Sequence, residues 1–347
     1  MSQSVWTKAL TLLVLGSILI VGCAPAPTAA PAAPATEAPA AEAPAAPTEV
    51  PAKEIVIGHS FPDLQNPYYV SVRDAVTPLM EAAGYTYIVT DSAQDPAKQI
   101  TDIENLVQRG ATLIFIDAVD PTAVVPAVQA ANDADIPVVT LMRKPTGGSW
   151  VTNVYLDSIK HGELACQLIV DKLGGTGNVV DLQGILATDA GRDRTKGCGN
   201  ALTAAPGITL VAQVPAGWNR TEALNQMSTI LEAHPDVDAV FGANDEEALG
   251  AIQAFKAAGI DPATIVITGV DGTLEAFEAI CKHEMSGTVA TFGTEEANII
   301  MELTNNVVTG ETPPESLEFK GELVTLDNMD AMIEKAGYDL DCAALAP

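Results

Sequence analysis

The feature that most constrains this chain is a repeated alternation of short apolar runs with amphipathic helical stretches. Nine runs are rich in β-branched residues and apolar throughout, which is typical of parallel strands buried on both faces. They cover residues 55–59, 85–90, 112–117, 136–141, 178–183, 208–214, 239–243, 265–270 and 288–292. Strand and helix repeated this often predict an α/β fold, in which helices flank parallel sheets and right-handed crossovers join the strands.

The stretches between these runs carry the residues that start and stop helices. Asp95 can cap a first turn, Pro96 suits the first helical position, and Gly110 suits the position just past the end. Two further helices are predicted over 219–233 and 246–258, where the apolar residues fall on one face.

The first 23 residues are typical of an export signal rather than of a membrane span. Lys8 precedes a 14-residue apolar stretch, 9–22, which is shorter than the roughly 20 residues that a spanning helix needs. The stretch ends at Ile20-Val21-Gly22-Cys23, which resembles the bacterial lipobox. That resemblance implies that residues 1–23 are a lipoprotein signal peptide and that Cys23 carries the lipid. An ordinary export signal with a chance cysteine is the alternative.

Residues 24–52 are predicted to be a disordered tether. They contain 14 Ala, 8 Pro and three Glu but no basic residue, so they have almost nothing to bury. In a polyproline conformation such a segment reaches about 90 Å, at ~3.1 Å per residue. The remaining segment, 53–347, is long enough to divide into two domains.

Four cysteines remain in that segment, and none of them has the spacing of a zinc site. The exported compartment would be oxidising, so disulfides are possible, and buried free thiols are the alternative. We expect the pairs Cys166 with Cys198 and Cys281 with Cys342.

The charge excludes several classes of partner. The chain has 17 Lys and Arg against 45 Asp and Glu, a formal net charge of −28. This balance argues against a nucleic-acid partner and against docking on anionic lipids, which leaves the lipid anchor as the membrane contact.

Ligands of parallel sheets bind beyond the carboxyl ends of the strands, so the residues that follow each run are the candidate site. Aromatic, guanidinium, amide and carboxylate groups gather at these positions, and they suit a small polar molecule. They are Ser60, Asn66, Tyr68, Tyr69, Arg143, Arg194, Trp218, Asn244 and Asp271. Taken singly, Asn244 and Asp271 could equally be turn residues.

Several ordered blocks resemble the ribose-binding-protein-like branch of the substrate-binding proteins of bacterial ABC sugar importers. The blocks include Asn66-Pro67-Tyr68-Tyr69, 136–141, 182–184, 192–194, 233–237, 244–246 and 269–273. The resemblance implies the type I periplasmic binding protein fold, with two Rossmann-like lobes, 53–156 plus 292–321 and 157–291 plus 322–347. A three-segment hinge would cross near Leu156/Asp157, Thr291/Phe292 and Gly321, and Tyr69 and Trp218 would sandwich a sugar ring between the lobes.

Two departures from the family pattern bear on the ligand. Met142 stands where the ribose binders have Asp, and Thr291 stands where they have Gln. With Arg143 and Arg194 against Asp271, the predicted site carries about +1. We therefore expect either a sugar or polyol other than ribose, or a ligand with an acidic group.

The predicted function is an extracytoplasmic binder that captures a monosaccharide or polyol by hinge closure and delivers it to an ABC permease. We expect a monomer that faces the periplasm or the extracellular side and uses no cofactor or metal. An enzyme is not expected, because the chain lacks a G-x-S-x-G elbow and a Walker loop. A sugar-responsive repressor would need a basic DNA-binding segment at its N-terminus. A binder that feeds a chemoreceptor or sensor kinase remains an alternative.

Overall fold

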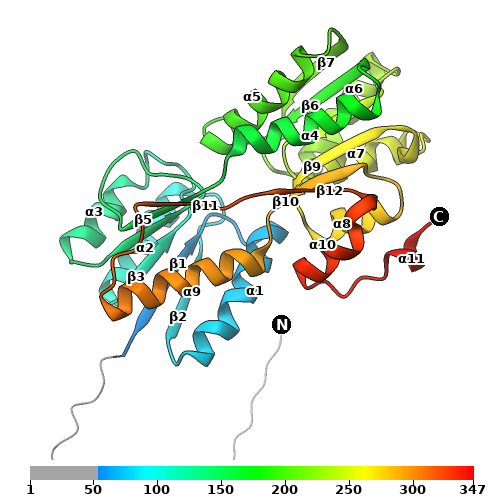
Figure 1. Ribbon diagram of the computed structural model, residues 1–347. Helices are drawn as coiled ribbons and strands as arrows, with labels where there is room; N and C mark the ends of the chain where they lie inside the picture. Colours follow the sequence, from blue (N-terminus) through cyan, green and yellow to red (C-terminus); the bar gives the residue numbers. More distant parts are fainter. Residues whose placement is uncertain (1–53) are drawn as a thin grey trace, which may run out of the picture. The chain divides into compact units, whose positions relative to one another are not determined.

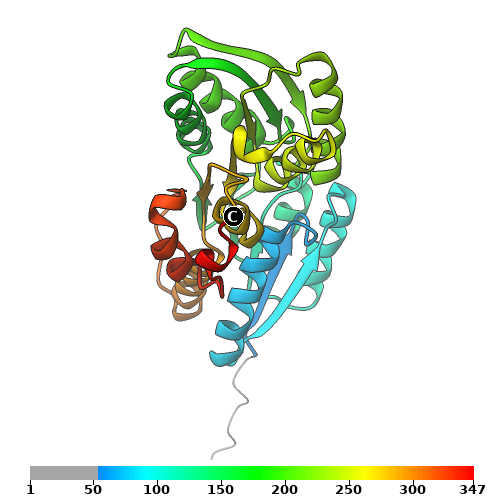
Figure 2. The same ribbon diagram turned by 90° about the vertical axis from the view of Figure 1, so that its right-hand side faces the viewer.

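The computed structural model describes residues 54–347 and contains two six-stranded sheets (Figure 1). The predicted signal peptide with Cys23 and the predicted tether lie outside the described residues. Figures 1 and 2 show helices on both faces of each sheet. We call the two sheets with their helices the N-lobe and the C-lobe.

The N-lobe sheet is parallel throughout and has the order β11-β5-β4-β3-β1-β2. Its strands are β1 (Val56–Phe61), β2 (Thr86–Asp91), β3 (Leu113–Ile116), β4 (Val138–Leu141), β5 (Thr152–Tyr155) and β11 (Ser316–Glu318). Helices α1 (Pro67–Ala82) and α9 (Gly293–Thr309) cover one face, and α2 (Pro96–Gln108) and α3 (Val125–Asp133) cover the other.

The C-lobe sheet repeats this order as β12-β10-β9-β8-β6-β7, with only β12 antiparallel. Its strands are β6 (Thr176–Gln183), β7 (Gly207–Pro215), β8 (Ala239–Gly242), β9 (Val266–Asp271), β10 (Gly287–Ala290) and β12 (Glu322–Val324). Helices α4 (Ser158–Lys172) and α5 (Asp189–Thr203) pack on one face. The other face carries α6 (Arg220–Ala233), α7 (Asp245–Ala257), α8 (Leu274–Cys281), α10 (Met329–Ala336) and α11 (Cys342–Leu345).

The α/β fold predicted from the sequence is confirmed, and all nine apolar runs form strands. Helix α2 begins as expected, because the Asp95 carboxylate accepts the backbone N–H groups of Ala97 and Lys98. The sequence pattern missed β5, β11 and β12, which have only three or four residues and no continuous apolar run.

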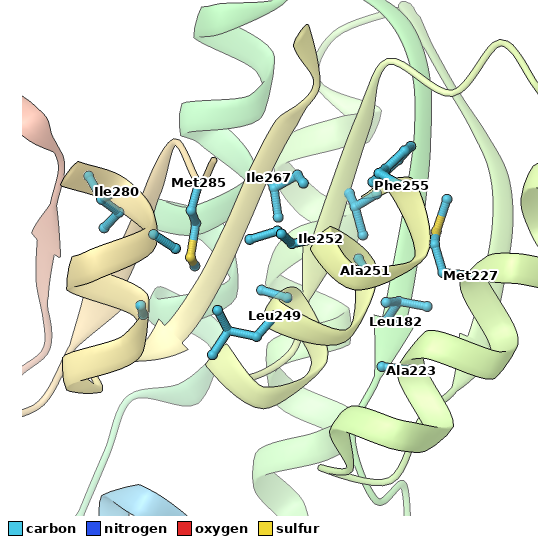
Figure 3. Close-up of a cluster of buried hydrophobic side chains, with 14 of the residues drawn as sticks. Leu182, Ala223, Met227, Leu249, Ala251, Ile252, Phe255, Ile267, Ile280 and Met285 are labelled. Carbon is cyan, nitrogen blue, oxygen red and sulfur yellow. The ribbon is translucent and has the colours of Figure 1, made fainter. Parts of the chain in front are cut away.

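The core of the C-lobe fills the space between its sheet and the helices α6 and α7 (Figure 3). Ile252 of α7 lies next to Ile267 of β9, and Met227 of α6 lies near Phe255 of α7. Phe255 is fully buried, so truncating it to Ala costs about 3–5 kcal/mol of unfolding free energy.

Two disulfides connect elements of the C-lobe. Cys166 of α4 is bonded to Cys198 of α5, and Cys281 at the end of α8 is bonded to Cys342 at the start of α11. This is the pairing that the sequence analysis expected. No cysteine lies among the described residues of the N-lobe.

The chain passes between the two sheets three times. It leaves the N-lobe sheet after β5, returns between β10 and α9, and crosses again between β11 and β12. These crossings bring the carboxyl ends of the strands of both sheets to one shared cavity.

Candidate functional site

The cavity between the lobes has about 470 Å³ of space not occupied by protein atoms. Nine of the eleven ligand-facing residues predicted from the sequence line it: Tyr68, Tyr69, Met142, Arg143, Arg194, Trp218, Asn244, Asp271 and Thr291. Leu156, Ser158 and Ala190 complete the lining.

The N-lobe contributes two adjacent tyrosines from the first turn of α1. Their rings meet edge to face with centroids 5.4 Å apart, and the Tyr69 ring also meets Phe61 at 6.1 Å. The Tyr68 hydroxyl donates a hydrogen bond to the buried Glu296 carboxylate of α9. Burial raises the pKa of Glu296 to about 8. Tyr68 is therefore fixed from behind, and the aromatic surfaces face the cavity.

Arg143 follows β4 and brings a buried guanidinium to the N-lobe side. Its Nη1 donates to the backbone carbonyl of Ala118 at 2.9 Å, and its Nε lies 3.9 Å from an oxygen of Asp117. Burial raises the pKa of Asp117 to about 6, although Arg143 and Tyr69 oppose that shift. Neither oxygen of the Asp117 carboxylate has a hydrogen-bond partner among the described residues.

The C-lobe contributes a buried ion pair. Arg194 Nη1 of α5 lies 3.3 Å from Asp271 Oδ1 at the end of β9 and donates to the carbonyl of Ala243 at 2.8 Å. Burial raises the pKa of Asp271 to about 6, and Arg194 opposes the shift. The Nε of Arg194 has no hydrogen-bond partner within residues 54–347.

Trp218 stacks against the same arginine. The Arg194 guanidinium carbon lies 5.3 Å from the centre of the indole ring, within the range of a cation–π contact. The indole packs on Gly184, where a Cβ atom would come within 2.1 Å of the ring. The Trp218 backbone N–H donates to Glu247 of α7 at 2.7 Å, while the indole N–H finds no partner in the described part of the chain.

Asn244 caps α7 and also lines the cavity. Its side-chain oxygen accepts the Glu247 backbone N–H at 2.9 Å, and the Glu247 carboxylate accepts the Asn244 N–H, which completes a capping box. Its side-chain NH₂ group is buried without a partner in residues 54–347. Asn244 therefore starts α7 and keeps a donor free at the cavity.

Backbone strain is concentrated at this site. Seven described residues other than glycine have a positive φ angle, and three of them line the cavity. Met142, Trp218 and Asp271 have φ values of 54°, 63° and 130°. Residues other than glycine rarely adopt a positive φ angle unless the surrounding structure holds the backbone there. Such residues cluster at functional sites.

Two predicted ligand-facing residues lie outside the cavity lining and have structural contacts instead. Ser60 is fully buried within β1, and its hydroxyl accepts a hydrogen bond from Gln99 of α2. Asn66 caps α1, since its side-chain oxygen accepts the Tyr68 N–H at 2.9 Å. The Asn66 cap fixes the start of α1, the helix that carries Tyr68 and Tyr69.

Sequence reasoning missed the residues that support the site from behind. Asp117 ends a predicted strand, 112–117, and could have been found by reading the last strand residue as well as the first loop residue. Glu247 and Glu296 lie inside helices, where nothing in the sequence separates them from exposed acids.

Residues 54–347 contain neither a metal-binding cluster nor a membrane-spanning helix. No group of three or more His, Cys, Asp or Glu side chains in this range is arranged to hold a metal ion. No helix in this range has both the length and the apolar character of a membrane span.

Comparison with known proteins identifies the family. The model of the periplasmic binding protein domain matches residues 57–312. The ribose import binding protein of Salmonella typhimurium is 38% identical over 248 residues, which cover 72% of this chain and 83% of that protein. The xylitol-binding protein of Mycolicibacterium smegmatis is 31% identical over 249 residues, covering 71% of each.

A solved structure agrees with these sequence matches. The ABC transporter solute binding protein of Bacillus halodurans, with bound myo-inositol, has a TM-score of 0.75 at 29% identity, covering 81% of this chain and 98% of that chain. The family model, the relatives and the two-sheet architecture agree, and the chain belongs to the periplasmic binding protein family with the type I fold.

Proposed function

We propose that this protein is the solute-binding component of an ABC importer and captures a neutral monosaccharide or polyol in the cavity between its lobes. Relatives named for ribose import and xylitol binding, and the structural neighbour with bound myo-inositol, support this class of ligand. The relatives are binding proteins, and we expect no chemistry on the ligand.

One observation carries the proposal: buried donors without a protein partner belong to residues that line the cavity between the lobes. Arg194 Nε, Trp218 Nε1 and Asn244 Nδ2 are all buried and unpartnered in the described part of the chain. A buried polar group left unpaired costs about 1–3 kcal/mol. A molecule with several hydroxyl groups can satisfy such donors together, and the aromatic rings of Tyr69 and Trp218 can cover its C–H faces.

The charges of the site favour a neutral ligand over a sugar acid. The count of about +1 from the sequence omitted Asp117, whose carboxylate lies beside Arg143. Each buried arginine now has an acidic neighbour, Asp117 for Arg143 and Asp271 for Arg194, so the formal sum is zero. An acidic ligand would lack an unpaired cation, although it remains the alternative that a screen must include.

The mechanism we propose is hinge closure. The lobes, 53–156 plus 292–321 and 157–291 plus 322–347, would rotate about the three crossings. A ligand that contacts both halves stabilises the closed form by its differential affinity for that form. Closure would change the outer surface that a membrane permease reads.

The N-terminal segments would keep the binder near the permease. Lipidation of Cys23 and an extended 24–52 tether would anchor the exported protein and let it reach across the membrane surface. Delivery to a chemoreceptor or sensor kinase is the second candidate, and neighbouring genes for an ATPase and a permease would decide for transport.

A thermal-shift screen tests the proposal. The purified protein is heated with D-ribose, xylitol, myo-inositol, other neutral sugars and sugar acids. A neutral compound that binds the folded form raises the midpoint, with about 2.7 kcal/mol of stabilisation at one hundred times Kd. A shift produced only by sugar acids would contradict the neutral assignment, and no shift with any member would remove the proposed function.

A further inference from the structure

The Asp271 side chain faces the cavity from a backbone that must be held in place. Its φ of 130° is unfavourable for a residue with a side chain. The next residue, Gly272, has a φ of 82°, and a Cβ there would lie 2.3 Å from the Ala290 side chain. The turn after β9 is therefore tight and pressed against β10.

Two hydrogen-bonding groups of the C-lobe core hold this turn from one side. The buried Asp245 carboxylate accepts the backbone N–H groups of Gly272 and Thr273, both at 2.8 Å. Thr291 donates its backbone N–H to the Asp271 carbonyl at 2.9 Å. These contacts leave the Gly272 carbonyl to be held by another part of the chain.

That contact comes from the C-terminal end of the protein. The Tyr338 hydroxyl donates to the Gly272 carbonyl at 2.8 Å, and the Tyr338 ring meets Phe277 of α8 edge to face at 5.3 Å. We call residues 337–347 the C-terminal strap. It lies beyond the segment 57–312 that the family model matches.

The strap runs along α8 and contacts both ends of that helix. Tyr338 bonds the residue just before its cap, and the Cys281–Cys342 disulfide ties the strap to its last residue. Figure 1 shows α10 and α11 in red beside α8, and α11 contacts α8 directly. Only three residues separate Tyr338 from Cys342, so the disulfide restricts where the tyrosine can go.

We propose that Tyr338 is a positioning residue for the ligand-facing carboxylate of Asp271, and that the Cys281–Cys342 disulfide keeps Tyr338 on the turn. This inference rests on the proposed function for its effect on affinity. Its structural half, the bracing of the turn, does not depend on any ligand.

The ligand-free test is amide hydrogen exchange at Gly272 and Thr273 in the purified full-length chain. Tyr338→Phe removes one hydroxyl, and exchange at these two amides should accelerate about fivefold, the factor for losing a hydrogen bond of typical net strength. Tyr85→Phe is the matched control, because its hydroxyl bonds Asn305 on the surface of the N-lobe. Unchanged exchange in Tyr338→Phe would overturn the proposal.

The disulfide half is tested with a matched pair of double variants. C281S/C342S frees the strap and should accelerate the same two amides at least as much as Tyr338→Phe. C166S/C198S removes the other disulfide of the same lobe and should leave these amides unchanged relative to the rest of the C-lobe. Equal acceleration in both double variants would show a general loosening and overturn the role of the strap.

The binding test separates positioning from ordinary stability. The probe is whichever of D-ribose, xylitol and myo-inositol raises the melting midpoint most, and Tyr338→Phe should weaken its Kd about fivefold. In an Asp271→Asn background the same change should have little further effect on Kd, because the carboxylate that Tyr338 positions is gone. A full fivefold loss in that background would overturn positioning through Asp271. If no probe binds the unaltered protein, the proposed function fails, and the exchange measurement still decides on the strap.

Discussion

The two lobes share one topology but hold their halves of the site by different means. Both sheets have the same strand order, and both present side chains at the carboxyl ends of their strands. The N-lobe half consists mainly of Tyr68, Tyr69, Met142 and Arg143, which packing and a few hydrogen bonds hold.

The C-lobe half is braced far more heavily. Both disulfides lie in this lobe, a buried carboxylate holds the turn that carries Asp271, and Glu247 holds the backbone of Trp218 and Asn244. Two lobes with the same topology can therefore support their parts of a binding site by different contacts. We interpret the C-lobe as the rigid template and the N-lobe as the surface that closes on it.

The largest expected effect concerns the disulfides, which only the C-lobe contains among the described residues. They close loops with sequence separations of 32 and 61 residues. In the chain-entropy view each contributes about 4 kcal/mol to the unfolding free energy. Reduction should therefore accelerate amide exchange throughout the C-lobe and leave the N-lobe core nearly unchanged. Equal losses of protection in both lobes would contradict the proposed difference between them.

The second prediction compares the two facing aromatic residues. Trp218→Ala removes the larger ring and its contact with the Arg194 guanidinium, so affinity for the best neutral sugar should fall about 100-fold or more. Tyr69→Ala should cost about 10-fold, since no cation lies over that ring among residues 54–347 as one does over Trp218. Isothermal titration measures both values. A greater loss from the Tyr69 change would reverse the assignment of template and closing surface.

The third prediction compares the two carboxylates that accompany the arginines. Asp271→Asn keeps the shape but removes the charge paired with Arg194 at 3.3 Å, and affinity should fall by about 10- to 100-fold. Asp117→Asn should cost less, about threefold to 10-fold, because its oxygen lies 3.9 Å from Arg143. Titrations of both variants against one sugar test this order, and equal losses would contradict it.

The smallest expected effect is a pH dependence in which stability and affinity change in opposite directions. Burial raises the pKa of Asp117 and Asp271 to about 6, Asp245 to about 7, and Glu247 and Glu296 to about 8. Between pH 8 and 6.5 the folded state therefore binds more protons than the unfolded state. Below pH 6.5 the buried His59 and His161 oppose this trend, because burial lowers their pKa to about 3. The unfolding free energy of the ligand-free protein should rise by about 1 kcal/mol or more as the pH falls from 8 to 6.5.

Affinity should fall as the pH decreases toward 5. Protonation of Asp271 and Asp117 below pH 6 removes the charges that balance Arg194 and Arg143. Denaturant titrations without ligand and sugar titrations at the same pH values separate the two effects. Affinity that is constant from pH 7.5 to pH 5 would argue that neither carboxylate takes part in binding.

Most of the fold could be predicted from the sequence, because buried parallel strands appear as apolar runs and helix ends are marked by capping residues, proline and glycine. Asp95 caps the helix that its position suggested. The short strands β5, β11 and β12 were not predicted, because they form by pairing with a neighbouring strand and their own composition does not indicate a strand.

The site residues that follow strands could be predicted from the sequence. The residues that hold these cavity-lining residues in place could not. Tyr69, Arg143 and Trp218 occupy positions after strands and do line the cavity. Asp245 and Tyr338 support the Asp271 turn from positions 26 residues before it and 67 residues after it. Only the folded chain brings these contacts together, so no local pattern could indicate them.

The most direct test of the account is the distance between the lobes with and without the sugar that raises the midpoint most. Spin labels at the exposed Gln108 of the N-lobe and the exposed Thr203 of the C-lobe would report this distance by pulsed electron paramagnetic resonance. Hinge closure predicts one shorter, narrower distance distribution at saturating sugar, and no such change in Trp218→Ala. An identical distribution with and without bound sugar would contradict capture by hinge closure.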